Sequence, residues 1–345
     1  MNEAPAHDGI SSIAFLPSSN YICAELNGGL DRWCDAIIQQ AIIPGIQSYK
    51  SFCSMSRPRI LITGASGFLG GHLCRIAGQE GEVIGAYHAH QTLSPGTIPL
   101  QLDLENAQAL AAQLAEVKPD IVIHTAVLQV DACEQNPELA KRVNVQAAHV
   151  IAEWCGCEQR RLVYISSDLV FEGTKGEYAE TDPSNPVMLY GKTKLAAERA
   201  VLEYCPSACV ARLPLMYGFP AAGGSNFFLN MLTRLQHGER VPVFQDQYRT
   251  PGLVNNMAAA VWELAASNFR GVLHVAGATR CSRYDVARLV CRLGNLDEAL
   301  LQPVSMFDIP ALAPRPKDVS LICAMAKSVL QTKLIGVEEG LQLIL

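Results

Sequence analysis

The chain of 345 residues has no run of 18 consecutive apolar residues, no block of basic residues and no low-complexity tract. The first absence argues against a membrane-spanning helix. A net charge of −6 without a cluster of lysine and arginine disfavours binding to nucleic acid through a basic face. The N-terminus also lacks the basic segment and short apolar stretch of a secretory signal. We therefore expect a cytoplasmic protein that binds neither nucleic acid nor a membrane.

The sequence also lacks the paired cysteines of a metal site or a disulfide scaffold. Its twelve cysteines are scattered, and several lie inside apolar runs. Cys155 and Cys157 are close in sequence, as are Cys205 and Cys209, but neither pair has a second pair or a histidine cluster at metal-site spacing. We therefore expect reduced, buried cysteines that act as small hydrophobic side chains, and no required metal.

Residues 1–54 lack a sustained hydrophobic period, apart from a short helix that the sequence allows over Asp31 to Ala41. At Met55 the pattern changes to MSRPRILITGASGFLG, which is typical of the start of an α/β enzyme. We predict that residues 1–54 are either a poorly ordered extension or an over-extended reading frame. The fold is then expected to need only the residues that follow.

From Pro58 onward, short apolar strands alternate with helices. Such strands indicate a parallel sheet buried on both faces, so we predict a doubly wound α/β fold. A nucleotide-binding domain is expected over residues 55–215, and a mainly substrate-binding part, interleaved with it, over 216–345. The predicted strands are 59–63, 83–87, 98–102, 121–125, 162–166 and 208–213, and helices are predicted over 107–117 and 137–155, after the first strand and around Tyr190.

Three glycines, Gly64, Gly67 and Gly70, lie between the first strand and the helix that follows it. Glycine lets the backbone turn tightly and lets a pyrophosphate approach the N-terminus of a helix, where free N–H groups and the helix dipole favour anions. The alternative is that these glycines serve only the turn and helix packing. Their position between a strand and a helix favours a dinucleotide site of the Rossmann type.

The end of the second strand bears on the choice of cofactor. An NAD site usually has a carboxylate there, which binds the ribose 2′-hydroxyl. Here the sequence is AYHAH, so a 2′-phosphate would not be repelled, and His88 or His90 could contact it. We therefore favour NADP(H), with NAD(H) as the alternative, although both histidines could equally be solvated loop residues.

Tyr190 and Lys194 are four residues apart in LYGKTKLAAER, so a helix there would place the phenol and the ammonium on one face. A free phenol has a pKa of about 10, too high for a proton shuttle at pH 7. An ammonium one turn away would stabilise the phenolate and lower that pKa. The pair taken alone could also be two ordinary surface residues, because this spacing is common.

The glycine turn, the Tyr190–Lys194 pair and the upstream Ser167 together resemble the extended short-chain dehydrogenase/reductase superfamily over nearly all of residues 59–345. The resemblance implies an NAD(P)-dependent oxidoreductase. In it, Tyr190 donates a proton, Ser167 bonds the substrate carbonyl oxygen, and Lys194, positioned by Asn144 through a water molecule, also holds the nicotinamide ribose. The cofactor-binding residues that the resemblance implies are Gly64, Ser66, Gly67, Phe68, Leu69, Gly70, His88, Asp103, Leu104, Thr125, Ala126, Val127, Tyr190 and Lys194.

Within that superfamily, the stretches VDACEQNPELAKRVNVQAA and YISSDLVFEGTKGEYAETDPSNPVMLYGKTKLAAE are most similar to dTDP-4-dehydrorhamnose reductases. They also resemble the regulatory β subunit of methionine adenosyltransferase. The chain differs from the reductases at Leu215 and Met216, where that group usually has an aromatic residue that lines the sugar pocket.

Basic residues of the C-terminal third are the expected contacts of a substrate diphosphate. The resemblance points to Arg249 and Arg315, because a guanidinium group pairs with phosphate oxygens in bidentate fashion. Asn226, at the start of a predicted helix, is a further candidate. The alternatives are that Arg249 caps a loop and that Arg315 pairs with Asp318.

These observations predict an NADPH-dependent reductase of a nucleotide-linked 4-keto sugar, which could form a homodimer. One alternative is an NAD-dependent nucleotide-sugar epimerase or dehydratase that uses the same catalytic set. Asp168, beside Ser167, does not separate these enzymes, because reductases of the group carry it as well. The other alternative is a non-catalytic regulatory subunit, and the complete set of Ser167, Tyr190 and Lys194 argues against it.

Overall fold

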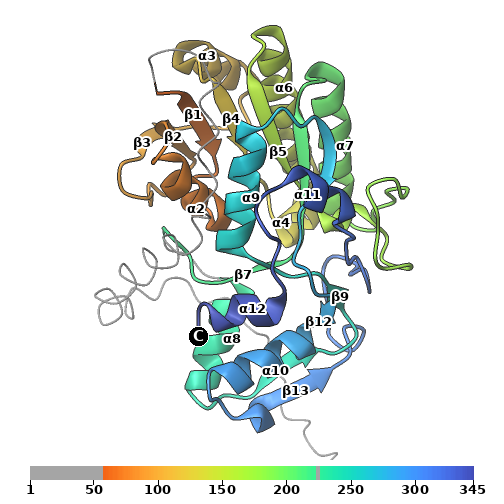
Figure 1. The fold of residues 1–345 in the computed structure, drawn as a ribbon. Helices are drawn as coiled ribbons and strands as arrows, with labels where there is room; N and C mark the ends of the chain where they lie inside the picture. The colour runs from red at the N-terminus through yellow and green to blue at the C-terminus, as the bar shows by residue number, and fades with distance from the viewer. Residues whose placement is uncertain (1–56, 223–225) are drawn as a thin grey trace, which may run out of the picture. The chain divides into compact units, whose positions relative to one another are not determined.

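The computed structural model describes residues 57–222 and 226–345 (Figure 1). The helix predicted over Asp31 to Ala41, and the prediction about residues 1–54 as a whole, lie outside these residues. Within the described part of the chain, every helix is too short or too polar to span a bilayer.

Seven parallel strands form the central sheet, in the order β11-β6-β5-β4-β1-β2-β3. The first strand, β1, lies in the middle of the sheet; the chain continues outwards through β2 to β3 and then returns to form β4 on the other side of β1. Ligands of such sheets bind at the carboxyl ends of the strands next to this reversal. The predicted doubly wound α/β fold is confirmed. The strands are β1 Arg59–Thr63, β2 Glu82–Tyr87, β3 Ile98–Gln101, β4 Ile121–His124, β5 Arg161–Ser167, β6 Cys209–Leu213 and β11 Gly271–His274.

Helices cover both faces of the sheet. Successive side chains of a strand point to opposite faces, so apolar side chains on both faces need to be buried. In β1, Ile60 and Ile62 pack in the core under α2 and α9, whereas Leu61 packs in the core under α3, α6 and α7 (Figure 1). All three residues are buried, which explains the continuous apolar runs in the sequence. The helices are α2 Phe68–Ala77, α9 Val254–Ala266 and α11 Ala324–Val329 on one face, and α3 Ala107–Val117, α6 Ala147–Cys157 and α7 Leu189–Tyr204 on the other.

The helix predicted over 137–155 is interrupted. After α4 Val130–Gln135, the chain forms α5 Pro137–Ala140, a π-helical turn over Lys141–Gln146, and only then α6. A π turn inserts extra backbone into a helix and is frequent at functional sites. Here it contains the buried Asn144.

The chain beyond residue 215 forms a smaller layer and also rejoins the main sheet through α9 and β11 (Figure 1). The smaller layer has its own apolar core, in which Phe228, Leu232, Val290 and Leu341 are buried. Its elements are β7 Met216–Tyr217, α8 Phe227–Gln236, β8 Val241–Phe244, β9 Tyr248–Arg249, β10 Gly252–Leu253, β12 Cys281–Ser282, α10 Arg283–Leu293, β13 Leu301–Val304 and α12 Val337–Gln342.

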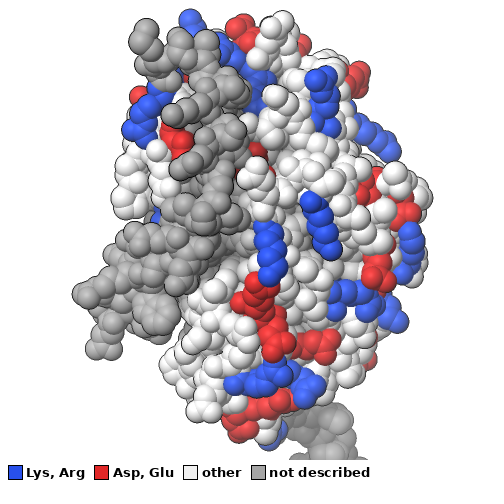
Figure 2. All heavy atoms as spheres, viewed as in Figure 1, with Lys and Arg blue, Asp and Glu red and all other residues white. Residues whose placement is uncertain are grey.

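The cysteines that the structure describes are free. Cys155, Cys205 and Cys209 are buried, as predicted, but Cys157 is exposed, because it ends α6 on the outer side of that helix. On the face drawn in Figure 2, basic and acidic side chains of the described residues lie next to one another over the surface. This mixing agrees with the absence of basic blocks from the sequence.

Candidate active site

The glycine turn after β1 has two kinds of glycine. Gly64 has a φ of +68°, and a Cβ there would lie 2.8 Å from Thr125 Oγ1. A Cβ on Gly70 would collide with the carbonyl oxygen of Gly64. Gly67 has a φ of −83°, and the only nearby atom for its Cβ is the Gly64 oxygen, at 3.0 Å. Gly64 and Gly70 are therefore needed for the turn itself, whereas Gly67 leaves room for a ligand.

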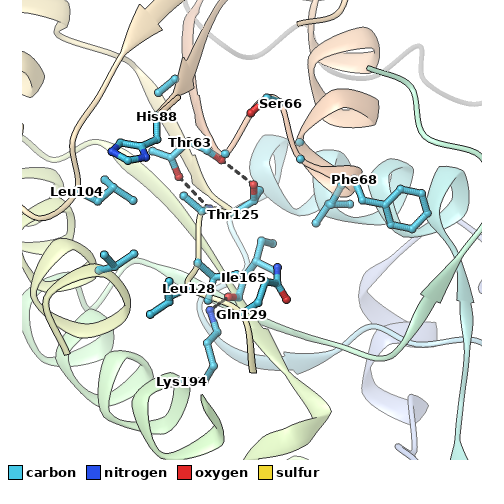
Figure 3. A pocket seen from close by; sticks show the side chains of 18 of the residues that line it. Thr63, Ser66, Phe68, His88, Leu104, Thr125, Leu128, Gln129, Ile165 and Lys194 are labelled. Carbon is cyan, nitrogen blue, oxygen red and sulfur yellow. Dashed lines mark hydrogen bonds between the residues drawn. The ribbon is translucent and has the colours of Figure 1, made fainter. Parts of the chain in front are cut away.

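A pocket of about 490 Å³ opens at the carboxyl ends of the strands (Figure 3). Volumes of this size are typical of small-molecule sites. It is lined by all the residues that sequence analysis assigned to the cofactor, with Ser167, Tyr190 and Lys194. Gly67 also starts α2 without a side-chain cap, so the first N–H groups of the helix are available to an anion. The turn, its N–H donors and the pocket fit a dinucleotide.

One wall of the pocket is fixed by Thr63, which sequence analysis missed. Its hydroxyl lies 2.7 Å from His124 Nδ1, and its carbonyl accepts a hydrogen bond of 2.6 Å from Thr125 Oγ1. The amide of Ala126 also donates to Thr63 Oγ1, at 3.3 Å. These bonds hold the loop after β4 against β1. Burial lowers the pKa of His124 to about 3, so this ring is neutral.

The far end of the pocket contains His88 and Asp103, both exposed. His88 lies beside Leu104 in Figure 3. Asp103 Oδ1 accepts a hydrogen bond of 2.9 Å from the amide of Glu105, which shapes the loop after β3. His90 does not line the pocket, so His88 is the histidine in a position to meet a cofactor.

Ser167 and Tyr190 meet at the opposite end of the pocket. Ser167 ends β5, and its Oγ donates to Asp168 Oδ1 at 3.1 Å while it accepts from the amide of Leu169 at 3.2 Å. Tyr190 lies in the first turn of α7. Burial raises the pKa of Tyr190, the nearby Asp168 and Cys133 raise it further, and a hydrogen bond with Ser167 lowers it.

The pKa of Tyr190 is raised by burial and not lowered, so the expected lowering beside Lys194 is not found in this structure. The Lys194 ammonium donates to the carbonyl oxygen of Ile165 and lies 4.2 Å from the centre of the Tyr164 ring. Burial lowers the pKa of Lys194 to about 7, although the nearby Glu198 and Cys133 raise it. Burial therefore dominates at both residues of the pair.

Asn144 reaches the site through its neighbours. Its Oδ1 accepts from the amide of Leu128 at 2.7 Å, and its Nδ2 donates to Thr193 Oγ1 at 3.0 Å. Thr193 precedes Lys194 in α7. Asn144 thus ties the loop after β4 to the helix that carries Lys194.

The three candidate substrate residues have different environments. Arg249 is buried, and its Nε lies 3.6 Å from Asp168 Oδ2. Asn226 caps α8, accepting from the amide of Leu229 and donating to the carbonyl of Gly218, each at 3.0 Å. Arg315 packs against the ring of Phe244. Asp318 pairs with Arg280, so the alternative pairing of Arg315 with Asp318 is not formed.

The family model of the RmlD substrate binding domain matches residues 58–345. The probable low-salt glycan biosynthesis reductase Agl14 of Haloferax volcanii is 33% identical over 264 residues, covering 74% of this chain and 87% of the relative. Methionine adenosyltransferase 2 subunit beta of Bos taurus is 31% identical over 276 residues, covering 77% and 80%. The solved dTDP-4-dehydrorhamnose reductase of Bacillus anthracis in complex with NADP has a TM-score of 0.74 at 28% identity, covering 84% of this chain and 98% of that one.

Proposed function

The chain belongs to the family of the RmlD substrate binding domain, and from this premise we propose that it is an NADPH-dependent reductase of a nucleotide-linked 4-keto sugar. One observation carries the proposal: Ser167, Tyr190 and Lys194 all line the pocket that begins at the glycine turn. A binding protein needs the turn, but it has no need for a hydroxyl, a phenol and an amine gathered at one end of the pocket.

The chain's own groups supply positioning and a proton. The first N–H groups of α2 would hold the cofactor phosphates, and the nicotinamide, when bound, supplies the hydride. Ser167 Oγ is placed to donate to the substrate carbonyl oxygen, and Tyr190 to deliver the proton to that oxygen as it is reduced. Lys194, one turn after Tyr190, is placed to hold the nicotinamide ribose.

The pKa of Tyr190 favours the direction of reduction. Because burial and the Asp168 charge raise that pKa, the phenol keeps its proton at neutral pH. Keto reduction consumes a proton, so the resting state of Tyr190 is the acid that the step requires. The opposite reaction, alcohol oxidation, would need the phenolate, which burial disfavours.

The end of β2 supports NADPH as the reductant. His88 lines the pocket there, and the sequence from Tyr87 to His90 contains no carboxylate that would bind a 2′-hydroxyl and repel a 2′-phosphate. The solved relative from Bacillus anthracis was crystallised with NADP. NADH is the alternative cofactor.

A regulatory subunit is the second candidate function, because the bovine relative is a subunit of methionine adenosyltransferase. Such a protein would bind a nucleotide without turnover. The two functions can be distinguished by the effect of a Tyr190 substitution: a reductase loses turnover, whereas a regulatory subunit has no turnover to lose.

The test is oxidation of NADPH, followed at 340 nm, by the purified protein with dTDP-linked and UDP-linked 4-keto sugars. We expect turnover that falls about 10²-fold or more in Tyr190→Phe, the usual scale for losing a positioned acid. NADPH affinity should stay the same, because only one oxygen is removed. Tyr204→Phe, at the exposed end of the same helix, is the matched control.

Full activity of Tyr190→Phe would show that the proton comes from another group. Tight NADPH binding without turnover of any 4-keto sugar would favour the regulatory subunit. A clear preference for NADH would contradict the cofactor assignment.

A further inference from the structure

Glu198, which sequence analysis did not single out, lies one turn after Lys194 on the buried side of α7. Its carboxylate accepts three hydrogen bonds. Ser166 Oγ and Arg212 Nε donate to Oε1, the latter at 2.9 Å, and Arg212 Nη2 donates to Oε2 at 2.7 Å. Such a bidentate pair fixes the direction of a carboxylate. Because Ser166 directly precedes Ser167, Glu198 joins the end of β5 to the helix that carries Lys194.

Two buried cations lie beside this one carboxylate. The exposed fractions of Lys194, Glu198 and Arg212 are 3%, 2% and 5%. Burial of an ion pair costs solvation free energy, and apolar residues of similar volume often replace such a pair without loss of stability. Stability alone therefore does not explain a buried carboxylate at this place. Its position next to a buried amine of the pocket gives a second reason.

On its other side, Arg212 is held by neutral groups. Its Nη2 donates to Ser184 Oγ at 3.0 Å, and its Nη1 lies 3.4 Å from His274 Nε2. A guanidinium has donors only, so His274 Nε2 is the acceptor, and the ring proton lies on Nδ1, 3.2 Å from the carbonyl oxygen of Ile322. Burial lowers the pKa of His274, which agrees with a neutral ring. The anionic partner of Arg212 is Glu198.

The other titratable side chains around Lys194 are neutral or paired. Burial raises the pKa of the thiol and of both phenols and lowers that of the imidazole, and these groups are Cys133 on α4, Tyr164 on β5, Tyr190 on α7 and His124 on β4. Asp168, on the turn after β5, pairs with Arg249. Burial lowers the pKa of Lys194 to about 7, and the nearby Glu198 is the largest of the influences that raise it. Glu198 is therefore the charge that favours the protonated amine.

We propose that Glu198 is a positioning residue: held by Ser166 and Arg212, its carboxylate keeps Lys194 in the ammonium form that donates to the nicotinamide ribose. The inference rests on the proposed function, because it concerns the amine assigned to the cofactor in the same site. An ammonium group has three donors, and the Ile165 carbonyl accepts one of them, so two remain for the hydroxyls of a ribose.

The test is calorimetric titration of the full chain with NADP, without any sugar, between about pH 5 and pH 9, the range in which a buried lysine loses its proton. Wild-type affinity should fall as the pH rises above the pKa of Lys194. Lys194→Met should lack this step and so identify it. The cofactor's own phosphate titrates alike with every protein, so only differences between proteins count.

Glu198→Gln removes the negative charge but keeps an acceptor for Ser166 and Arg212. We expect its step about one pH unit lower than in the wild-type protein, because a nearby opposite charge is lost. Above both steps, this shift weakens NADP about 10-fold. Glu203→Gln, at an exposed position of the same helix, is the matched control and should leave affinity and step unchanged.

Arg212→Gln separates this role from a merely structural one. It breaks the same ion pair but leaves the Glu198 carboxylate beside Lys194 and removes a like charge, so the step should move to higher pH. A pair that serves only the fold would weaken NADP in the same way in both variants, with no opposite shifts.

The inference would be overturned by an equal step in the wild-type protein and a folded Glu198→Gln variant, by shifts of both variants in one direction, or by a wild-type protein without a step that depends on Lys194. Glu198→Gln leaves Arg212 unpaired in a buried place, which costs stability. If it does not fold, the double variant Glu198→Gln/Arg212→Gln removes both charges. Its step should still lie at lower pH, because Glu198 is the member of the pair one turn from Lys194, and an unshifted step would overturn the inference.

The two proposals can fail separately. Reduction of a 4-keto sugar by a protein whose pH step does not depend on Glu198 would keep the function and refute the positioning role. A step that depends on Glu198, in a protein that reduces no 4-keto sugar, would keep the positioning role and refute the reductase.

Discussion

The side chain of Lys194 is buried, and burial lowers the pKa of its amino group to about 7. Its immediate partners are the Ile165 carbonyl and the Tyr164 ring. The carboxylate one turn later, Glu198, already forms an ion pair with Arg212 at 2.7 Å. The protonated form of Lys194 is therefore destabilised by burial, and the Glu198 carboxylate compensates for this only in part.

This cost gives a prediction at the scale of one residue. The pKa of Lys194 is about 7 when folded and about 10.4 in an unfolded chain, so the unfolded state binds more protons between these values, and wild-type stability should rise with pH there. Lys194→Met removes the buried charge and should melt above the wild-type protein at pH 6, with a smaller difference at pH 9. Each kcal/mol corresponds to about 2–4 °C. Turnover of a 4-keto sugar and NADPH affinity should both fall.

The exposed Lys192→Met, on the same helix, is the control for thermal unfolding followed by circular dichroism. A lower melting temperature of Lys194→Met at pH 6 would mean that the ammonium contributes net stability. The pKa of Lys194 would then not be lowered in the folded protein.

At the scale of elements, the glycine turn permits a comparison of two substitutions that are three positions apart, at Gly67 and Gly70. Gly67→Val places a side chain in the pocket, where only the Gly64 oxygen is near, and the backbone φ suits a non-glycine residue. We expect it to abolish NADPH binding, measured by calorimetry, with little loss of stability. Gly70→Val forces atoms into the Gly64 backbone and should lower the melting temperature strongly, because the turn cannot close. Unchanged NADPH affinity of Gly67→Val would contradict the cofactor site.

Local patterns explain which elements could be predicted from the sequence. Buried parallel strands are continuous apolar runs, so β1 and β4 were found nearly at their observed bounds. The π turn around Asn144 has no such pattern, because it depends on what Asn144 contacts across the structure, namely Leu128 and Thr193.

At the scale of the whole molecule, the site depends on C-terminal segments that pack against the N-terminal half of the described chain. The strand β11, from the C-terminal third, completes the sheet beside β6, and α9 packs on the face that α2 covers. Just before α9 in the chain, β9 carries Arg249 to Asp168, which follows β5. Hydrophobic periodicity reports one element at a time, so these non-local pairings could be expected only from the family resemblance.

The last prediction concerns how much of the chain this architecture needs. The family match begins at residue 58 and β1 at Arg59, whose amide donates to Asp120 at 2.9 Å and whose side chain pairs with Glu82 at 3.0 Å. All seven strands lie among the described residues. We therefore propose that a chain starting at Met55 keeps the melting temperature and the NADPH affinity of the full chain. A chain starting at Ala65 lacks β1, the strand between β2 and β4, and should not fold. A clear loss of stability in the chain that starts at Met55 would show that residues 1–54 contribute to the folded protein.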